Sequence, residues 1–415
     1  MHAALVAVIC AASIAGVLLR PRRLPEWAFA LAGAIALVAF GLVPPLDAGA
    51  AIARGTDVYL FLTGMMVLAE LARREGVFDW VAGHAVAAAH GSRARLFALV
   101  YATGVCVTIV LSNDATAVVL TPAVAAAIRA AKVPPLPYLF ACAFVANAAS
   151  FVLPISNPAN LVVFAGGMPA LGRWLASFAL PSLVTIGATF ALLALASRAD
   201  LSGDAAAAGD VPPLRTTGRV TLAGIAFTAL ALVIASAFDA PLGVTTFACG
   251  AIAFVATGAF DRAAFGGVAR GVSWSVLVLV AGLFVLVRGL ESTGLLAAAR
   301  AGAAAAAAWP PVLSHLMGAG VAALASNLAN NLPAGLLAGS AASSLHGHEG
   351  FRAAVAIGID LGPNLSVTGS LATVLWLTAL RREGIDVSAA RFLRTGAVVM
   401  PLALVLAVLA LSRSS

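Results

Sequence analysis

The chain has 415 residues, of which 62% are hydrophobic and 10% are charged, and its net charge is +7. A soluble domain carries about 25% charged residues, so this composition excludes a disordered chain and a soluble enzyme with a charged shell. Apolar stretches long enough to cross a bilayer recur from end to end, which predicts an all-α polytopic membrane protein.

Ten apolar stretches have the length of a membrane crossing. They lie at about 3–20, 25–43, 56–72, 137–165, 171–197, 219–237, 242–259, 272–290, 352–380 and 390–412. Two further apolar blocks, at about 95–130 and 312–345, are interrupted by polar residues at mid-length. Each half-block is shorter than the roughly 20 residues that a crossing needs. We therefore expect two re-entrant helical hairpins, each entering and leaving the bilayer on one side.

The basic residues indicate the orientation. Arginines follow the first apolar run and no basic segment precedes it, which is typical of an uncleaved first span with its N-terminus outside. Of the 24 Lys and Arg residues, 18 share one side of the expected topology: Arg20, Arg22, Arg23, Arg73, Arg74, Arg93, Arg95, Arg129, Lys132, Arg198, Arg215, Arg219, Arg262, Arg270, Arg381, Arg382, Arg391 and Arg394. Because positive residues concentrate in the cytoplasm, we expect both termini outside. The net charge then reflects topology and requires no nucleic-acid partner.

Short segments of the first half recur in the second at a nearly constant offset along the chain. The matching pairs are Gly33–Ala39 with Gly250–Ala256, Gly64–Leu68 with Gly282–Leu286, Gly76 with Gly294, and Ser112-Asn113 with Ser326-Asn327. Each half holds five expected crossings, an odd number, so the second copy must be inverted. Inverted repeats with interrupted helices are typical of secondary transporters. We assign residues 1–200 to the first repeat, 201–217 to a cytoplasmic linker and 218–415 to the second repeat.

Four polar segments interrupt the apolar stretches: the two hairpin turns, and breaks inside the crossings at 137–165 and 352–380. Asn157-Pro158 and Gly362-Pro363 should break their helices, since proline lacks an amide donor and glycine weakens a helix. A buried amide or hydroxyl group without a partner costs about 1–3 kcal/mol, which favours a shared polar site at the bilayer midplane. The candidate substrate-binding residues are Ser112, Asn113, Thr116, Ser156, Asn157, Asn160, Ser326, Asn327, Asn330, Asn331, Asn364, Ser366 and Thr368. The alternative is that they only cap and join broken helices.

Two acidic residues lie within these segments, Asp114 at the first hairpin turn and Asp360 before the second break. Carboxyl groups inside a membrane are rare and serve proton relays, so we expect both to couple transport to protons. The alternative is again that each caps a helix. Arg288 can pair with Glu291 one turn on, and we interpret it as structural, together with Glu70.

Other chemistry has little support. Cys106 and Cys142 would suit a thiophilic substrate, but a buried cysteine usually packs as a small hydrophobe, so whether either touches substrate is open. No metal site or cofactor is indicated, and the chain lacks a Walker lysine loop and a GxSxG elbow. Intrinsic ATP hydrolysis and serine hydrolysis are therefore not expected.

Four runs in the polar segments carry a specific resemblance. They are Leu111–Pro122, Asn147–Asn160, Asn330–Gly335 and Ile359–Thr373. These runs resemble the bacterial arsenite efflux permeases (ArsB family), and the similarity extends through nearly the whole chain. The resemblance implies an inner-membrane protein that exports arsenite and antimonite as neutral trihydroxides by proton antiport. Some relatives also use a soluble ATPase subunit (ArsA) at the cytoplasmic face.

The resemblance places the chain in a superfamily with sodium-coupled dicarboxylate carriers, which carry Ser-Asn-Thr at each hairpin tip. Here the tips are expected to be Ser112-Asn113-Asp114 and Ser326-Asn327-Leu328, a departure that disfavours sodium coupling. The polar segments hold no Lys or Arg, as suits a neutral substrate with three hydroxyl groups. The alternatives are a sodium- or proton-coupled carboxylate or inorganic anion carrier and, from another class, an intramembrane hydrolase that uses Asp114 with Asp360.

Overall fold

A computed structural model describes residues 2–21, 24–165, 167–206, 211–343, 345 and 347–414. Regular structure in these residues is helical, apart from one β-bridge between Ser92 and Asp204. Arg22 and Arg23 of the expected cytoplasmic set, and residues 207–210 of the expected linker, lie outside the described residues. The all-helical class is therefore confirmed.

Before the linker the chain forms two helices, a bent pair, a short helix, a hairpin, an interrupted helix and a long helix. These are α1 (His2–Leu19), α2 (Glu26–Ala39), α3 (Pro45–Arg54), α4 (Thr56–Arg74), α5 (Val77–Ala88), α6 (Arg93–Leu111), α7 (Asn113–Ala115), the π-helical turn η2 (Thr116–Leu120), α8 (Thr121–Ala130), α9 (Leu136–Ala148), the single turn η3 (Pro154–Ser156), α10 (Pro158–Val163) and α11 (Leu171–Ala196). A short turn, α12 (Arg198–Leu201), leads into the linker.

After the linker the same order of elements recurs. The helices are α13 (Thr216–Ala237), α14 (Leu242–Phe260), α15 (Ala263–Gly271), α16 (Ser275–Glu291), α17 (Leu295–Ala307), α18 (Pro311–Ala329), α19 (Asn331–Ala342), α20 (Glu349–Leu361), the turn η4 (Gly362–Asn364), α21 (Leu371–Arg382) and α22 (Ala389–Ser414). Both interrupted helices lie in the crossings where breaks were expected. Pro158 is the first residue of α10, which residues 149–157 separate from α9, and Pro363 lies in the turn η4 directly after α20. Both are places where the amide hydrogen that proline lacks is not needed within a helix. The repeat boundaries and the inversion stay predictions.

Among the described residues, six helices are long and apolar enough to cross a membrane: α6, α11, α13, α14, α18 and α22. The number rises to eight if the pair α3–α4, bent by 49°, and the pair α15–α16, bent by 40°, each count as one span. The expectation that every arm of the hairpins is too short is wrong for α6 and α18. Each has 19 residues, or roughly 28 Å of helix. The arm α6 begins at Arg93, before the expected block, and α18 continues through Ser326 and Asn327 to Ala329. The ten-crossing topology stays a prediction.

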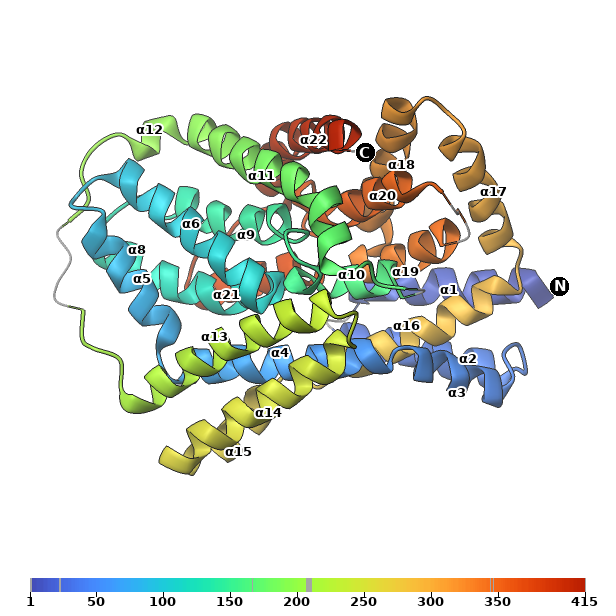
Figure 1. Ribbon diagram of the computed structural model, residues 1–415, viewed down its shortest axis with the longest axis horizontal. Helices are drawn as coiled ribbons and strands as arrows, with labels where there is room; N and C mark the ends of the chain where they lie inside the picture. Colours follow the sequence, from blue (N-terminus) through green and yellow to red (C-terminus); the bar gives the residue numbers. More distant parts are fainter. Residues whose placement is uncertain are drawn as a thin grey trace.

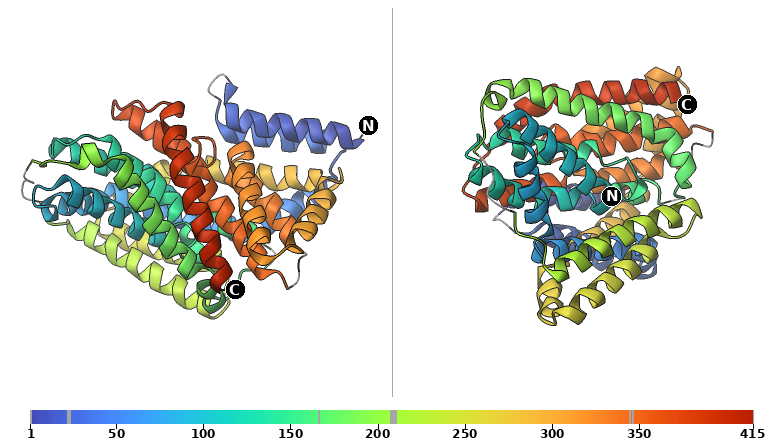
Figure 2. Two further views of the ribbon diagram at one scale, coloured as in Figure 1. Left: turned by 90° about the horizontal axis from the view of Figure 1, so that it is seen from above. Right: turned by 60° about the vertical axis from the view of Figure 1, so that its left-hand side comes forward.

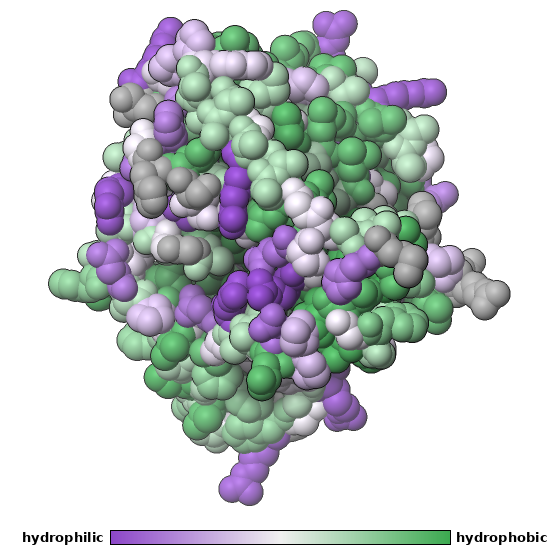
Figure 3. All heavy atoms as spheres, turned by 90° about the vertical axis from the view of Figure 1, so that its right-hand side faces the viewer, coloured by the Kyte–Doolittle hydropathy of each residue, from purple (hydrophilic) through white to green (hydrophobic). Residues whose placement is uncertain are grey.

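The outer surface of these helices is apolar. Large hydrophobic side chains are exposed on α11, α13 and α14, among them Leu183, Phe227 and Ile252. Figure 3 shows one face on which hydrophobic residues are widespread, with hydrophilic ones in a central group and scattered along the edge. Such a surface is stable in lipid and not in water, so the chain is a multi-pass membrane protein.

The helices pack as two groups, each built from both halves of the chain. The first group contains α1, α2, α4, α13, α14 and α16, with the short helices α3 and α15, and occupies the lower and right-hand part of Figure 1. The second group contains the two hairpins, the two interrupted helices and the long helices α11 and α22, which lie side by side in Figure 2. The second group holds all four polar segments.

Two glycines set the packing of the first group. Gly64 of α4 lies against the backbone of Thr246 in α14, and Gly282 of α16 lies against the backbone of Ala30 in α2. A Cβ atom at either glycine would collide with a carbonyl group. The two glycines were matched as equivalent from the sequence, and each packs on a helix of the opposite half. That reciprocity is what a duplication about a twofold axis requires.

The linker end of the molecule is fixed by polar contacts. The Arg93 guanidinium donates to the carbonyl of Asp204 at 2.9 Å, and the amide of Ala206 donates to the carbonyl of Ala131 at 2.8 Å. In Figure 1, α5 and α8 lie together at the left, opposite the N-terminus, with α12 above them. The described part of the linker is thus held against the starts and ends of neighbouring helices.

Candidate functional site

Hairpin one turns at Ser112, between α6 and α7. Ser112 has a φ of 88°, an uncommon conformation for a residue with a Cβ atom. The hydroxyl groups of Thr108 and Thr116 share a hydrogen bond of 2.8 Å across the hairpin, just where the second arm starts with the π-helical turn η2. Ser112, Asn113 and Thr116 are buried and Asp114 is partly buried. The expected residues of the first turn therefore lie together.

Hairpin two turns at Asn330, with a φ of 70°. Its side-chain oxygen accepts from the amide of Leu332 at 3.4 Å and caps α19. The turn therefore lies within the polar segment expected for it, residues 326–333. The tip expected at Ser326-Asn327-Leu328 is wrong, since α18 continues through these residues to Ala329. Their polar groups do not break the helix, because the Ser326 hydroxyl and the Asn327 amide both donate back to the carbonyl of Ala323, at 2.8 Å each. The structural counterpart of Ser112 is thus Asn330, which makes the second turn in the same left-handed conformation.

Break one separates α9 from α10. Asn157 accepts from the amide of Ala159 at 2.9 Å and caps α10, and its Nδ2 donates to Ser150 Oγ at 3.4 Å. Asn160 donates to the carbonyl of Ser150 at 2.9 Å. Ser156 donates to the carbonyl of Ile109 in α6 at 3.3 Å, which ties break one to hairpin one.

Break two is tied to hairpin two. Asn327 Nδ2 donates to the carbonyl of Gly362 at 2.8 Å, and its Oδ1 accepts from the Ser366 hydroxyl at 2.6 Å. Thr368 donates to the carbonyl of Asn327 at 3.1 Å. The amide of Asn331 donates to the carbonyl of Gly369 at 2.9 Å. Asn327 and Asn331 thus hold the end of the hairpin to the unwound chain.

Two side-chain pairs join break one to break two. Asn157 Nδ2 donates to Asp360 Oδ1 at 2.8 Å, and Asn147 Nδ2 donates to Asn364 Oδ1 at 2.9 Å. All four residues are at most 1% exposed. Sequence reasoning did not select Asn147, although it is offset from Asn364 by the same amount as the first pair of matched segments. Hydrogen bonds therefore connect hairpin one, both breaks and hairpin two in one series.

Several buried side-chain oxygens of this series, and of the neighbouring tip of hairpin one, accept no hydrogen bond in the described part of the chain. They are Oδ1 of Asn113, Asn147 and Asn160, and Oδ2 of Asp360. The orientation of Asn160 is fixed, because its amide nitrogen must face the carbonyl of Ser150, which can only accept. Buried acceptors without donors are costly. A ligand that donates hydrogen bonds, or carries positive charge, would satisfy them.

The alternative role as helix caps is observed for part of the set. Asn157 and Asn330 cap α10 and α19, and Ser370, which was not selected, caps α21 by accepting from the amide of Ala372 at 3.1 Å. Asp360 does not begin a helix and lies 0% exposed within α20. Asp114 lies in the first turn of α7, where no side chain makes a capping hydrogen bond. Capping therefore explains some of the asparagines and neither acid.

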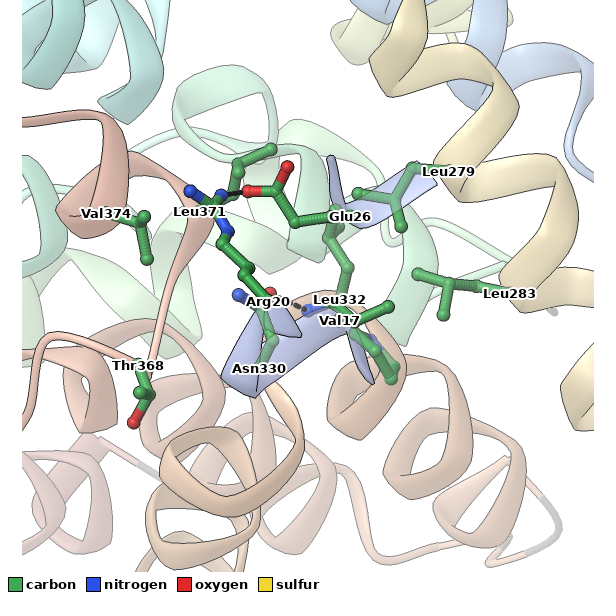
Figure 4. Close-up of a pocket in the computed structure, with 11 residues that line it drawn as sticks. Val17, Arg20, Glu26, Leu279, Leu283, Asn330, Leu332, Thr368, Leu371 and Val374 are labelled. Carbon is green, nitrogen blue, oxygen red and sulfur yellow. Dashed lines mark hydrogen bonds and ion pairs between the residues drawn. The ribbon is translucent and has the colours of Figure 1, made fainter. Parts of the chain in front are cut away.

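A cavity of about 20 Å³ lies between the two helix groups, beside the tip of hairpin two. Figure 4 shows Arg20 and Glu26 paired in it, with Asn330 and Thr368 below the pair and Leu283 of α16 at the right. A water molecule needs roughly 10–15 Å³ of such space, so the cavity admits about one. Arg20, which the sequence placed only in the cytoplasmic set, lies next to a polar tip, and Glu26 balances its charge.

The thiols and the remaining ion pairs lie apart from this series. Cys106 is exposed on α6, Cys142 is buried in α9, and all four cysteines are free. No group of three His, Cys, Asp or Glu side chains suited to a metal occurs in the described ranges. Arg288 pairs with Glu291, as expected, and also with Asp47 at 2.9 Å. Glu70 pairs with Arg73 at 2.6 Å.

Similarity to known proteins identifies the family. Residues 6–361 match the citrate transporter family, CitMHS. The chain belongs to this family of membrane transporters. The arsenical pump membrane protein of Escherichia coli K12 is 30% identical over 397 residues, which cover 90% of each chain. That of Yersinia enterocolitica is 31% identical over 355 residues, or 81% of each chain.

These matches confirm the resemblance to arsenite permeases that the polar runs indicated. An uncharacterized transporter of Mycobacterium tuberculosis is 26% identical over 84% of each chain. The crystal structure of the Alcanivorax borkumensis YdaH transporter has the same fold, with a TM-score of 0.57, 17% identity, and coverage of 88% of this chain and 86% of that one. The chain is thus a transporter by family, and it shares the fold of the YdaH transporter.

Proposed function

We propose that this protein exports arsenite and antimonite from the cytoplasm, as neutral trihydroxides, by proton antiport across the bacterial inner membrane. Energy comes from the proton motive force without a cofactor. The substrate binds at the hydrogen-bonded series formed by the hairpin tips and the helix breaks. A relative that is 30% identical and aligns over 90% of the chain is named an arsenical pump membrane protein. Its name supports this choice of substrate.

The observation that carries the proposal is the set of buried acceptors without donors, on Asn113, Asn147, Asn160 and Asp360. A trihydroxide of arsenic or antimony donates three O–H groups and brings no charge. Such a ligand supplies the missing donors without the cost of burying an ion. The polar segments themselves hold no Lys or Arg, so an anion would meet acceptor oxygens without a cationic partner.

The two acids supply the proton coupling. Asp360 Oδ2 lacks a partner while Oδ1 is held by Asn157, so one oxygen of the carboxyl is available to bind and release a proton. Asp114 lies beside the buried Asn113 at the other end of the series. We infer that protonation of these carboxyl groups and occupation by substrate alternate, so that protons and substrate move in opposite directions.

The two halves provide the alternation. The element order recurs around the linker, and Gly64 and Gly282 pack reciprocally on the opposite half. These features support an inverted repeat of two five-span units, 1–200 and 218–415, with hairpins at about 95–130 and 312–345. Such repeats let one group of helices rock against another around a central site. Both termini are then outside, and a soluble ATPase subunit would dock at the cytoplasmic face.

A second candidate is a sodium- or proton-coupled carrier of carboxylates, which the citrate name of the family favours. Citrate carries several negative charges and only one donor hydroxyl, so it needs cations beside the site. Arg20 lies near the tip of hairpin two, but Glu26 is paired with it. The unsatisfied acceptors therefore favour the trihydroxide.

The test uses everted membrane vesicles with an imposed proton gradient and neither ATP nor sodium. Vesicles with the protein should accumulate arsenite and lose it when a protonophore is added, whereas vesicles without the protein should not accumulate it. Sodium-dependent citrate uptake in the same vesicles, without arsenite accumulation, would establish the carboxylate carrier instead. Accumulation that appears only with an ATPase subunit and ATP would contradict proton antiport by the chain alone.

A further inference from the structure

The orientation of the Asn147 carboxamide is set by its neighbours. Asn364 Nδ2 donates to the carbonyl of Phe144 at 3.0 Å, and a carbonyl can only accept. Asn364 must therefore turn its Oδ1 toward Asn147, which presents Nδ2 to it at 2.9 Å. This leaves Asn147 Oδ1 pointing away from Asn364, buried and without a donor in the described residues.

The position of Asn147 adjoins the residues proposed to bind substrate. Its backbone carbonyl accepts from the amide of Ser150 at 3.3 Å, and Ser150 in turn contacts Asn157 and Asn160. Asn157 holds Asp360. The free oxygens of Asn147, Asn160 and Asp360 thus belong to residues joined by a short series of hydrogen bonds.

Asn147 and Asn364 also occupy equivalent places in the two halves. They are related by the same offset along the chain as Gly33 and Gly250, the start of the first matched segments. Each lies where its interrupted helix ends. A residue that bonds to its own counterpart lies on the axis relating the halves. At that position the Asn147 side chain lies next to the polar groups of both breaks.

We propose that Asn147 is a substrate-binding residue whose Oδ1 accepts a hydroxyl proton of the trihydroxide, while Asn364 holds its carboxamide in that orientation. Asn364 acts as a positioning residue. This inference rests on the proposed function and adds a contact that sequence patterns did not show. It also explains why the pair is amide to amide, since neither side needs a charge.

The test measures arsenite export by reconstituted protein at a range of arsenite concentrations. Asn147→Ala removes the acceptor and should raise KM about tenfold, the equivalent of one buried hydrogen bond, with Vmax less affected. Asn364→Ala frees the carboxamide without removing it and should raise KM less. The double variant should match Asn147→Ala alone, because the second residue acts through the first.

Ser182→Ala is the matched control, since it removes a buried hydroxyl of α11 that has no partner among the described residues. It should leave KM unchanged. A wild-type KM in Asn147→Ala, or additive losses in the double variant, would overturn the inference while wild-type export upheld the proposed function. A wild type that exports no arsenite would instead defeat the proposed function. Thermal unfolding of the same proteins shows whether a rise in KM comes from a damaged fold, in which case Asn147 is structural and the inference fails.

Discussion

The two hairpins have the same shape and different chemistry. Ser112 and Asn330 turn them with φ values of 88° and 70°, and each turn is followed by an asparagine. The next residue is Asp114 in hairpin one and Leu332 in hairpin two. Asn113 accepts no hydrogen bond at Oδ1, whereas Asn327 and Asn331 tie hairpin two to break two. The tip of hairpin one thus has an acid and few hydrogen bonds to its surroundings. The end of hairpin two has several such hydrogen bonds and no acid.

The acid of the broken helices lies in the second half of the chain, whereas the acid of the hairpins lies in the first half. Asp360 lies in the second broken helix, and the offset that relates Asn147 to Asn364 places Ala143 at the corresponding position of the first. Each half therefore contributes one acid, from a different element. Under the proposed inverted repeat, the two halves would keep a symmetric framework and place the proposed proton-binding groups at two separate points of the candidate site.

The largest effect on transport should come from removing the carboxyl group of hairpin one. Asp114→Asn removes the exchangeable proton and keeps the size and polarity of the side chain. We expect proton-driven arsenite accumulation in everted vesicles to fall about a hundredfold, as when other proton-transfer groups are removed. Leu332→Asn, at the equivalent place in hairpin two, should export at close to the wild-type rate. Full pH-driven export by Asp114→Asn would remove this residue from the coupling.

The next effect should come from cutting the ties of hairpin two. Asn327→Ala loses the bonds to Gly362 and Ser366 and leaves both groups without that partner. We expect the free energy of unfolding to drop by about 2–4 kcal/mol, measured by thermal unfolding in detergent. Asn113→Ala in hairpin one should cost less than about 1 kcal/mol, since no bond to its side-chain oxygen is lost. Equal losses would mean that the hairpins are held alike.

Sequence reasoning predicted the elements that obey local rules. The break at Gly362-Pro363, the end of the first break at Asn157-Pro158 and the pair Arg288–Glu291 were correct, because proline, glycine and residues one turn apart act over a few positions. The re-entrant course of the two hairpin blocks stays a prediction. The segments that form the candidate site were visible as polar runs in apolar surroundings. Their family resemblance was confirmed over most of the chain.

The errors arose where a choice depended on tertiary contacts. Within the expected turn segment 326–333, the tip was assigned to Ser326-Asn327, which matches Ser112-Asn113 in sequence. These two residues lie within α18, where Asn327 bonds to break two, and Asn330 makes the turn. Asn147 was missed because its role depends on Asn364, which is far away along the chain. Arg20 was interpreted only as one of the basic residues that indicate the cytoplasmic side, but it lies beside the tip of hairpin two. No local pattern encodes such contacts.

A smaller effect should separate the second arms of the hairpins. Gly339 of α19 lies against the backbone of Val163 at the end of α10, and a Cβ atom there would collide with it. Gly339→Ala should therefore lower the free energy of unfolding by about 1–3 kcal/mol, the usual cost of overpacking. Gly320→Ala on α18 meets nothing within 4 Å and should stabilise by up to about 1 kcal/mol through helix propensity. A stabilising Gly339→Ala would show that α10 and α19 are loosely packed.

The smallest effect should come from the corresponding contact of hairpin one. There α8 reaches the end of α21 through an ion pair between Arg129 and Glu383, with a nitrogen–oxygen distance of 2.8 Å and side chains 60% and 29% exposed. Solvent and salt screen such pairs, which contribute about 0–1 kcal/mol. Arg129→Gln should thus shift the unfolding temperature slightly at low ionic strength and not at all at about 1 M salt. A loss as large as that of Gly339→Ala, persisting in high salt, would mean that hairpin one is fixed as firmly as hairpin two. Asp114 at the tip of hairpin one would then be held as firmly as Leu332 at the equivalent position of hairpin two.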